Sequence, residues 1–130
     1  MVYTASSRAL AILEMLVQDQ PLHARYVIIA ATVPATVRIE RVPASALPAA
    51  WTSAQRSDEL RTIGGTWIKR AKSAVLCVPS AVVPSEFNYL LNPEHVDFRR
   101  IKQGRFETFT TDHRLLQRLS EAAPRKPRPA

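Results

Sequence analysis

The apolar residues of segment 9–17 recur with the period of a helix. At 100° per residue they cover one broad face, and Glu14 falls at the edge of that face. Ser6 or Ser7 can cap this helix, because a serine hydroxyl accepts a hydrogen bond from a free N–H group of the first turn. The segment is therefore predicted to be an amphipathic helix with an acid at the border of its buried side.

A second helical pattern covers residues 53–72. Gly64-Gly65 lies within this pattern and is expected to weaken or break the helix, because glycine is a poor helix former. A short helical turn is expected over residues 95–100.

Five segments have the composition or the alternation of strands. Residues 25–33 and 73–78 are rich in β-branched and other apolar residues, which predicts two buried strands. Residues 36–42 alternate apolar and charged side chains and predict a half-exposed strand. The other two segments are Val2-Tyr3, which resembles the end of a strand, and residues 105–110, which alternate again. Strands and helices without a regular βαβ order favour an α+β fold.

The stretch VLCVPSAVVPSEFNYLLNP, residues 75–93, begins like a buried strand and ends like a turn. Between these ends it holds two Val-Pro pairs, two serines, an acid and an amide, and we expect a rigid polar loop there. Its prolines restrict the backbone, and its serines and asparagines offer neutral hydrogen-bonding groups beside a buried strand.

The bulk composition limits the classes of protein to which this chain can belong. The chain has 130 residues, 46% of them hydrophobic, which is enough for the core of one domain. No apolar run approaches the roughly 20 residues of a membrane span, and the first residues do not read as a signal peptide. The single cysteine, Cys77, permits no internal disulfide, so a reducing, cytoplasmic location is expected.

The net charge of +7 raises the question of whether the chain binds nucleic acid. Three of these charges lie in the terminal PRKPRPA, so the rest of the chain carries only 7 − 3 = +4. The remaining charge is spread along the chain, and only residues 69–72 and 99–102 form local basic clusters. There is no aromatic-basic pattern, and nucleic-acid binding is not expected. We predict one domain over residues 1–118 and a disordered, basic, proline-rich tail over 119–130.

Several familiar kinds of catalytic site have no motif in this sequence. The Gly64-Gly65 pair lacks the spacing of a nucleotide-binding loop. The three histidines and Cys77 are far apart and give no metal signature, so no metal is expected. No serine occupies a nucleophile elbow.

Five segments together resemble the RES domain, the toxin half of RES–Xre toxin–antitoxin pairs. They occur in the family's order and span residues 2–116. The most specific pieces are Val78-Pro79-Ser80 and the run NYLLNPEH, residues 88–95. The resemblance implies an ADP-ribosyltransferase-like mixed sheet with helices, N-terminally shortened. The five segments are residues 3–14, 47–51, 62–68, 75–95 and 112–115.

The same resemblance implies that the chain consumes NAD⁺, cleaving the nicotinamide–ribose bond by glycohydrolysis, phosphorolysis or ADP-ribosyl transfer. It assigns Glu14 as the carboxylate near the ribose, Tyr3 as a ring that stacks on nicotinamide, and Ser80 as a ligand-bonding and catalytic residue. Asn92 is a further candidate for binding the dinucleotide. An Xre-type antitoxin is the implied partner, and the acceptor of ADP-ribose stays open.

Each of these residues also has an ordinary structural interpretation. Glu14 can be a surface acid near a helix start, and Tyr3 a simple strand tyrosine. Ser80 and Asn92 can both belong to turns, because serine bonds its own backbone and Asn-Pro commonly starts a turn.

The family's arginine has no counterpart in this chain, because it belongs to a segment before the strand that ends at Tyr3. We therefore expect residues 1–130 to turn over NAD⁺ weakly or not at all unless one of the two basic clusters reaches the site. The alternative function is that of a non-enzymatic RES remnant that binds an Xre-type antitoxin.

Overall fold

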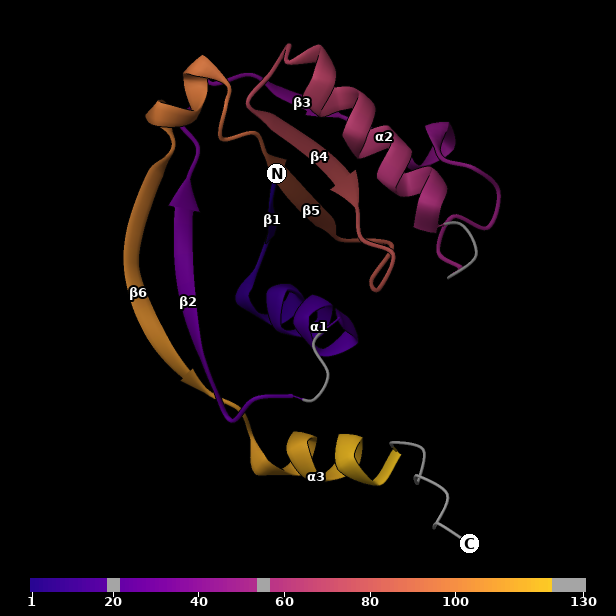
Figure 1. The fold of residues 1–130 in the computed structure, drawn as a ribbon, viewed down its shortest axis with the longest axis vertical. Coiled ribbons are helices and arrows are strands. Elements are labelled where there is room, and N and C mark those ends of the chain that lie inside the picture. Colours follow the sequence, from indigo (N-terminus) through magenta and orange to yellow (C-terminus); the bar gives the residue numbers. More distant parts are fainter. Residues whose placement is uncertain (19–21, 54–56, 123–130) are drawn as a thin grey trace, which may run out of the picture.

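The computed structural model describes residues 1–18, 22–53 and 57–122 and has an α+β fold, as the sequence predicts. A four-stranded sheet, a separate two-stranded ribbon and three α-helices make up this part of the chain (Figure 1). The elements in chain order are β1 Val2–Ala5, α1 Arg8–Gln18, β2 Arg25–Thr32, β3 Ile39–Arg41, the 3₁₀ turn Ala44–Ala46, α2 Ser57–Arg70, β4 Val75–Pro79, β5 Phe87–Leu91, the 3₁₀ turn Val96–Arg100, β6 Lys102–Thr110 and α3 His113–Ala122.

The four-stranded sheet has the order β1-β5-β4-β3 and holds the core. Strands β3 and β4 run parallel, and the other two pairs are antiparallel. Because successive side chains of a strand point to opposite faces, β4 and β5 contribute side chains to two separate apolar clusters. Val75 and Leu91 pack on one face, whereas Leu76 and Leu90 pack with Trp67 of α2 on the other. Helix α2 therefore covers one face of this sheet.

Helix α2 passes through Gly64-Gly65 without a break, so the predicted break is wrong. Gly64 is buried, and a Cβ atom there would meet the Met1 Cε and Leu90 Cδ1 atoms at 3.5 and 3.6 Å. Tertiary packing against Met1 and β5 therefore outweighs the weak helix propensity of glycine at this point.

The strand over residues 25–33 is confirmed as β2, but its predicted burial is wrong. Strand β2 pairs only with β6, and the ribbon curves away from the four-stranded sheet, on the left of Figure 1. Ile29 lies opposite Phe106, and their side chains are 48% and 70% exposed. A two-stranded ribbon has two faces, and the described residues cover neither of them along its full length.

The predicted loop over residues 75–93 contains a complete strand, β5, which the sequence analysis missed. Phe87–Leu91 lies between β1 and β4 and is therefore a central strand of the sheet. The polar loop is confined to residues 80–86, where the Ser80 N–H group donates to the Glu86 carbonyl at 2.8 Å. Asn88 and the nearby prolines are unusual in strands, so the local pattern did not predict β5. The strand forms because it pairs with β1 and β4.

Helix α3 was not predicted. Asp112 begins it, because its Oδ1 atom accepts the Arg114 backbone N–H at 2.9 Å. Hydrogen bonds from the Arg114 side chain and, to a smaller extent, from its backbone N–H hold the pKa of the Asp112 carboxyl well below its usual range. Residues 119–122 belong to α3, and 123–130 of the predicted tail lie outside the described residues. No helix within the described ranges has the length and apolar character needed to span a membrane.

Candidate functional site

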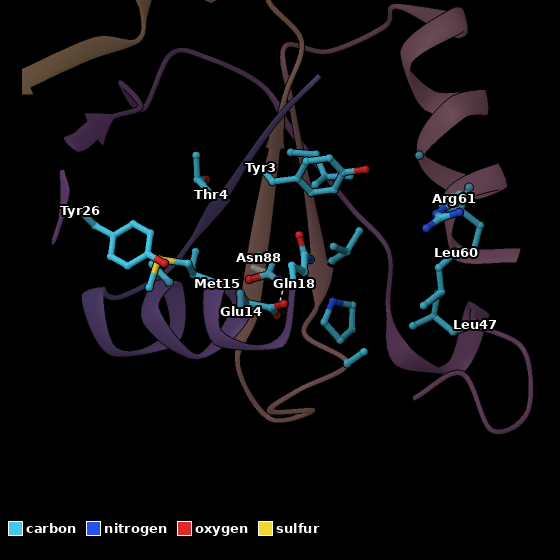
Figure 2. A pocket seen from close by; sticks show the side chains of 18 residues that line it. Tyr3, Thr4, Glu14, Met15, Gln18, Tyr26, Leu47, Leu60, Arg61 and Asn88 are labelled. Carbon is cyan, nitrogen blue, oxygen red and sulfur yellow. Dashed lines mark hydrogen bonds between the residues drawn. The ribbon is translucent and has the colours of Figure 1, made fainter. Parts of the chain in front are cut away.

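A cavity of about 950 Å³ lies between α1, the four-stranded sheet and α2. This volume is in the range of small-molecule binding sites. Figure 2 shows Glu14 on α1, Tyr3 and Asn88 at the sheet, and Leu60 and Arg61 on the α2 side. The floor and rim are largely apolar and include Met15, Leu47, Ile63, Val78, Pro79 and Leu90.

The Glu14 carboxylate is held by two short hydrogen bonds to its Oε1 atom. The Ser80 hydroxyl and the Asn88 side-chain amide both donate to this oxygen at 2.6 Å. The other oxygen, Oε2, receives no hydrogen bond from the described residues, and Glu14 is one of the residues that line the cavity. Two donors on one oxygen fix the carboxylate in place and leave the other oxygen available to a ligand.

Ser80 lies behind Glu14 and does not line the cavity. It has 0% exposure, and its Oγ atom accepts the backbone N–H groups of Val82 and Val83 at 3.1 and 3.0 Å. These two bonds occupy the acceptor side of the hydroxyl and direct its proton to Glu14. The sequence analysis assigned Ser80 to the ligand, whereas its observed partner is the carboxylate.

Asn88 lines the cavity, and the sequence analysis quoted it without assigning it to the site. Its Nδ2 atom must face Glu14, because a carboxylate only accepts hydrogen bonds. Its Oδ1 atom is buried and has no partner among the described residues. Asn88 could have been assigned to the site if the strand had been predicted. In the strand Phe87–Leu91, side chains alternate between faces, so Asn88 lies on the same face as Leu90.

Tyr3 projects from β1 into the cavity. Its backbone lies opposite Leu90 in the β1–β5 ladder, and its side chain is 68% exposed. The next residue, Thr4, donates from Oγ1 to the Tyr89 carbonyl at 2.8 Å and fastens this edge strand. The ring is therefore on a fixed backbone, with its surface open to a planar ligand.

Asn92 lies apart from the other three predicted residues. It is 2% exposed and borders a second cavity of about 540 Å³, beside Met1 and Lys69. Its Oδ1 atom accepts the Glu94 backbone N–H at 3.1 Å, which is the bonding of a turn-starting asparagine. The structure brings Tyr3, Glu14 and Ser80 together and leaves Asn92 outside that group.

Arg61 supplies a positive charge to the cavity wall, and sequence analysis did not single it out. Neither basic cluster named from the sequence lines this cavity. Helical spacing could have indicated Arg61. Ile63 and Gly64 lie three and four residues after Leu60, so all three line the same wall from one face of α2, and Arg61 lies beside them. Among the described residues, no group of three metal-binding side chains occurs.

Comparison with known proteins identifies a family and several relatives. Residues 1–112 match the family model of the RES domain. A Sphingobium protein (strain YBL2) named Prs ADP-ribosylating toxin is 33% identical over 121 residues, which cover 90% of this chain and 75% of that protein. A protein of Photorhabdus laumondii named Toxin Res is 34% identical over 119 residues, with coverages of 89% and 76%. A Toxin Res of Pseudomonas putida is 36% identical over 120 residues, with coverages of 88% and 78%.

Proposed function

This chain belongs to the RES domain family, and we propose that it is a toxin that cleaves NAD⁺ at the nicotinamide–ribose bond. The observation that carries the proposal is the Glu14 carboxylate, fixed by Ser80 and Asn88 at the wall of a large cavity that Tyr3 also lines. A relative with 33% identity is named as an ADP-ribosylating toxin, and ADP-ribosylation uses NAD⁺ as its donor.

The proposed chemistry is substitution at the ribose C1′ atom. The bond from C1′ to the nicotinamide nitrogen breaks, and its electron pair leaves with nicotinamide. An acceptor oxygen or nitrogen bonds to C1′ and gives up its proton to the surrounding solvent. Positive charge develops on the ribose in an oxocarbenium-like transition state, as in glycoside cleavage. The Glu14 carboxylate would stabilise this charge and accept a hydrogen bond from a ribose hydroxyl.

The remaining residues would position the reacting groups. Tyr3 would stack on the nicotinamide ring, because the face of an aromatic ring attracts a planar cation. Ser80 would act through Glu14 as a positioning residue rather than touch the dinucleotide. A binding role for Asn92 stays a prediction. Asn92 borders the second cavity, and Glu14 is not among the residues that line that cavity.

NAD⁺ loss and nicotinamide release by the purified chain test the proposal. Single-turnover conditions, with protein in excess over NAD⁺, are used because the sequence predicts that turnover is weak or absent. The product identifies the acceptor: free ADP-ribose means water, ADP-ribose 1″-phosphate means phosphate, and a labelled protein band with biotinylated NAD⁺ means transfer to protein. Absence of nicotinamide release under single-turnover conditions would contradict the proposed function.

The family also suggests the partner. RES toxins are paired with Xre-type antitoxins, and an active NAD⁺-consuming chain must be neutralised in its own cell. We propose an Xre-type antitoxin that covers or fills the cavity, because occupying the space in front of Glu14 would block the dinucleotide directly.

A further inference from the structure

We infer that Arg61 forms the pyrophosphate-binding wall of the cavity and makes it selective for a ligand with a diphosphate group. This inference rests on the proposed function, because it assigns one part of the NAD⁺ molecule to one part of the same cavity. It adds a binding residue on α2 that lies far along the chain from Tyr3, Glu14 and Ser80.

The charge distribution of the cavity carries the inference. Among the described residues that line it, Arg61 is the one cation and Glu14 is the one acid. They stand on opposite sides, with Glu14 on α1 and Arg61 on α2 (Figure 2). The lining between them is mostly apolar, so these two side chains determine the electrostatic polarity of the space.

The NAD⁺ molecule has a matching polarity. Its nicotinamide ring carries the positive charge, which suits the side of Glu14, and its pyrophosphate is negative, which suits the side of Arg61. A guanidinium group binds phosphate oxygens through two parallel hydrogen bonds and keeps its charge at any physiological pH. The opposite orientation would place the pyrophosphate against a carboxylate and would be disfavoured.

Arg61 is available for such a contact. Its side chain is 78% exposed, and the ion pair between its Nη1 atom and the Asp58 Oδ1 atom spans 3.6 Å. This distance is too long for a hydrogen bond, and an exposed pair of this kind on a helix contributes little to stability. A phosphate ligand can therefore replace Asp58 as the partner of Arg61 at low cost.

Isothermal titration of the full chain with ADP-ribose and with nicotinamide riboside tests the inference. ADP-ribose carries the diphosphate, and nicotinamide riboside carries only the end that would face Glu14. We expect Arg61→Ala to weaken ADP-ribose binding about tenfold, the size of a lost charged hydrogen bond, and to leave nicotinamide riboside binding unchanged. Arg70→Ala is the matched control, because it removes the same charge from the same helix outside the cavity lining.

A second variant tests the role of Asp58. Asp58→Asn removes the competing carboxylate, so it should tighten ADP-ribose binding and leave nicotinamide riboside binding unchanged. Equal ADP-ribose affinities for Arg61→Ala, Arg70→Ala and the unchanged chain would overturn this inference and leave the proposed function standing. An equal loss for both ligands in Arg61→Ala would also overturn it. Failure of the unchanged chain to bind ADP-ribose would overturn the inference and the proposed function together.

Discussion

At the scale of single residues, the two 2.6 Å hydrogen bonds to Glu14 Oε1 give the most direct test of mechanism. Glu14→Gln keeps the size of the side chain but removes its negative charge, so it can no longer stabilise a cationic transition state. We expect single-turnover NAD⁺ cleavage to fall by roughly a hundredfold or more. The control is Glu94→Gln, which removes an exposed acid that lies outside this cavity. Full activity in Glu14→Gln would show that another group is the catalytic residue.

Asn88 gives a second residue-scale prediction, this time about pH. Asn88→Asp replaces the amide that donates to Glu14 with a second carboxylate at the same short distance. Two carboxylates that close together share a proton, because like charges disfavour each other's ionised form. If the ionised carboxylate is the active form, the acid limb of the rate–pH profile should move to higher pH.

The matched variant Asn88→Ala removes the donor without adding charge. It should lower the rate and move the acid limb in the same direction but by less, because loss of a donor to the ionised carboxylate also disfavours that form. The same shift of the limb in both variants would argue that repulsion between carboxylates is not its cause, and that Asn88 affects the site in another way.

At the scale of elements, helix α1 presents Glu14 to the cavity, and its first turn depends on Ser7. The Leu10 backbone N–H donates to Ser7 Oγ at 3.1 Å, which identifies Ser7 as the cap that the sequence left open between two serines. Ser7→Ala should cost about 1 kcal/mol of unfolding free energy, measured by urea denaturation. Ser6→Ala is the neighbouring control, since among the described residues Ser6 is bonded through its backbone N–H, to the Phe87 carbonyl at 3.1 Å, and not through its hydroxyl. Equal effects of the two substitutions would contradict the assignment of the cap.

The elements that sequence predicted best are those whose own pattern decides their structure. Residues 9–17 have a helical apolar face and a serine cap, and they form α1. Residues 73–78 have a continuous apolar run, and they supply the buried strand β4. By contrast, Gly64 and β5 depend on partners far along the chain, which a local pattern does not contain.

The residues of the candidate site also fall into two groups, those that the sequence pointed to and those that only the fold brings to the cavity. Tyr3, Glu14 and Ser80 were found because they fall in segments that resemble a family, and the fold brings them together. Arg61 and Asn88 were not assigned to the candidate site: Arg61 lies just outside the segments that carry the resemblance, and Asn88 lies in NYLLNPEH but was given no role there. Each reaches the cavity only through the packing of α2 and β5 against the rest of the molecule.

At the scale of the whole molecule, two surfaces are candidates for contact with the proposed Xre-type antitoxin. One is the mouth of the cavity, where Leu47 is half-buried at the rim. The other is the β2–β6 ribbon, where Val27, Ile29 and Phe106 expose apolar side chains. Both could attract a protein partner, because exposed apolar residues that cluster on a surface often mark interaction sites.

A pair of matched substitutions separates these surfaces. Leu47→Glu places a charge at the cavity rim, and Ile29→Glu places the same charge on the ribbon. If the Xre-type antitoxin covers the cavity, Leu47→Glu should greatly reduce co-purification after co-expression, because an unpaired charge would be buried in the contact. Ile29→Glu should co-purify like the unchanged chain, and circular dichroism should show that both variants remain folded. Loss of the complex in Ile29→Glu, with Leu47→Glu still bound, would place the antitoxin on the ribbon and contradict direct blocking of Glu14.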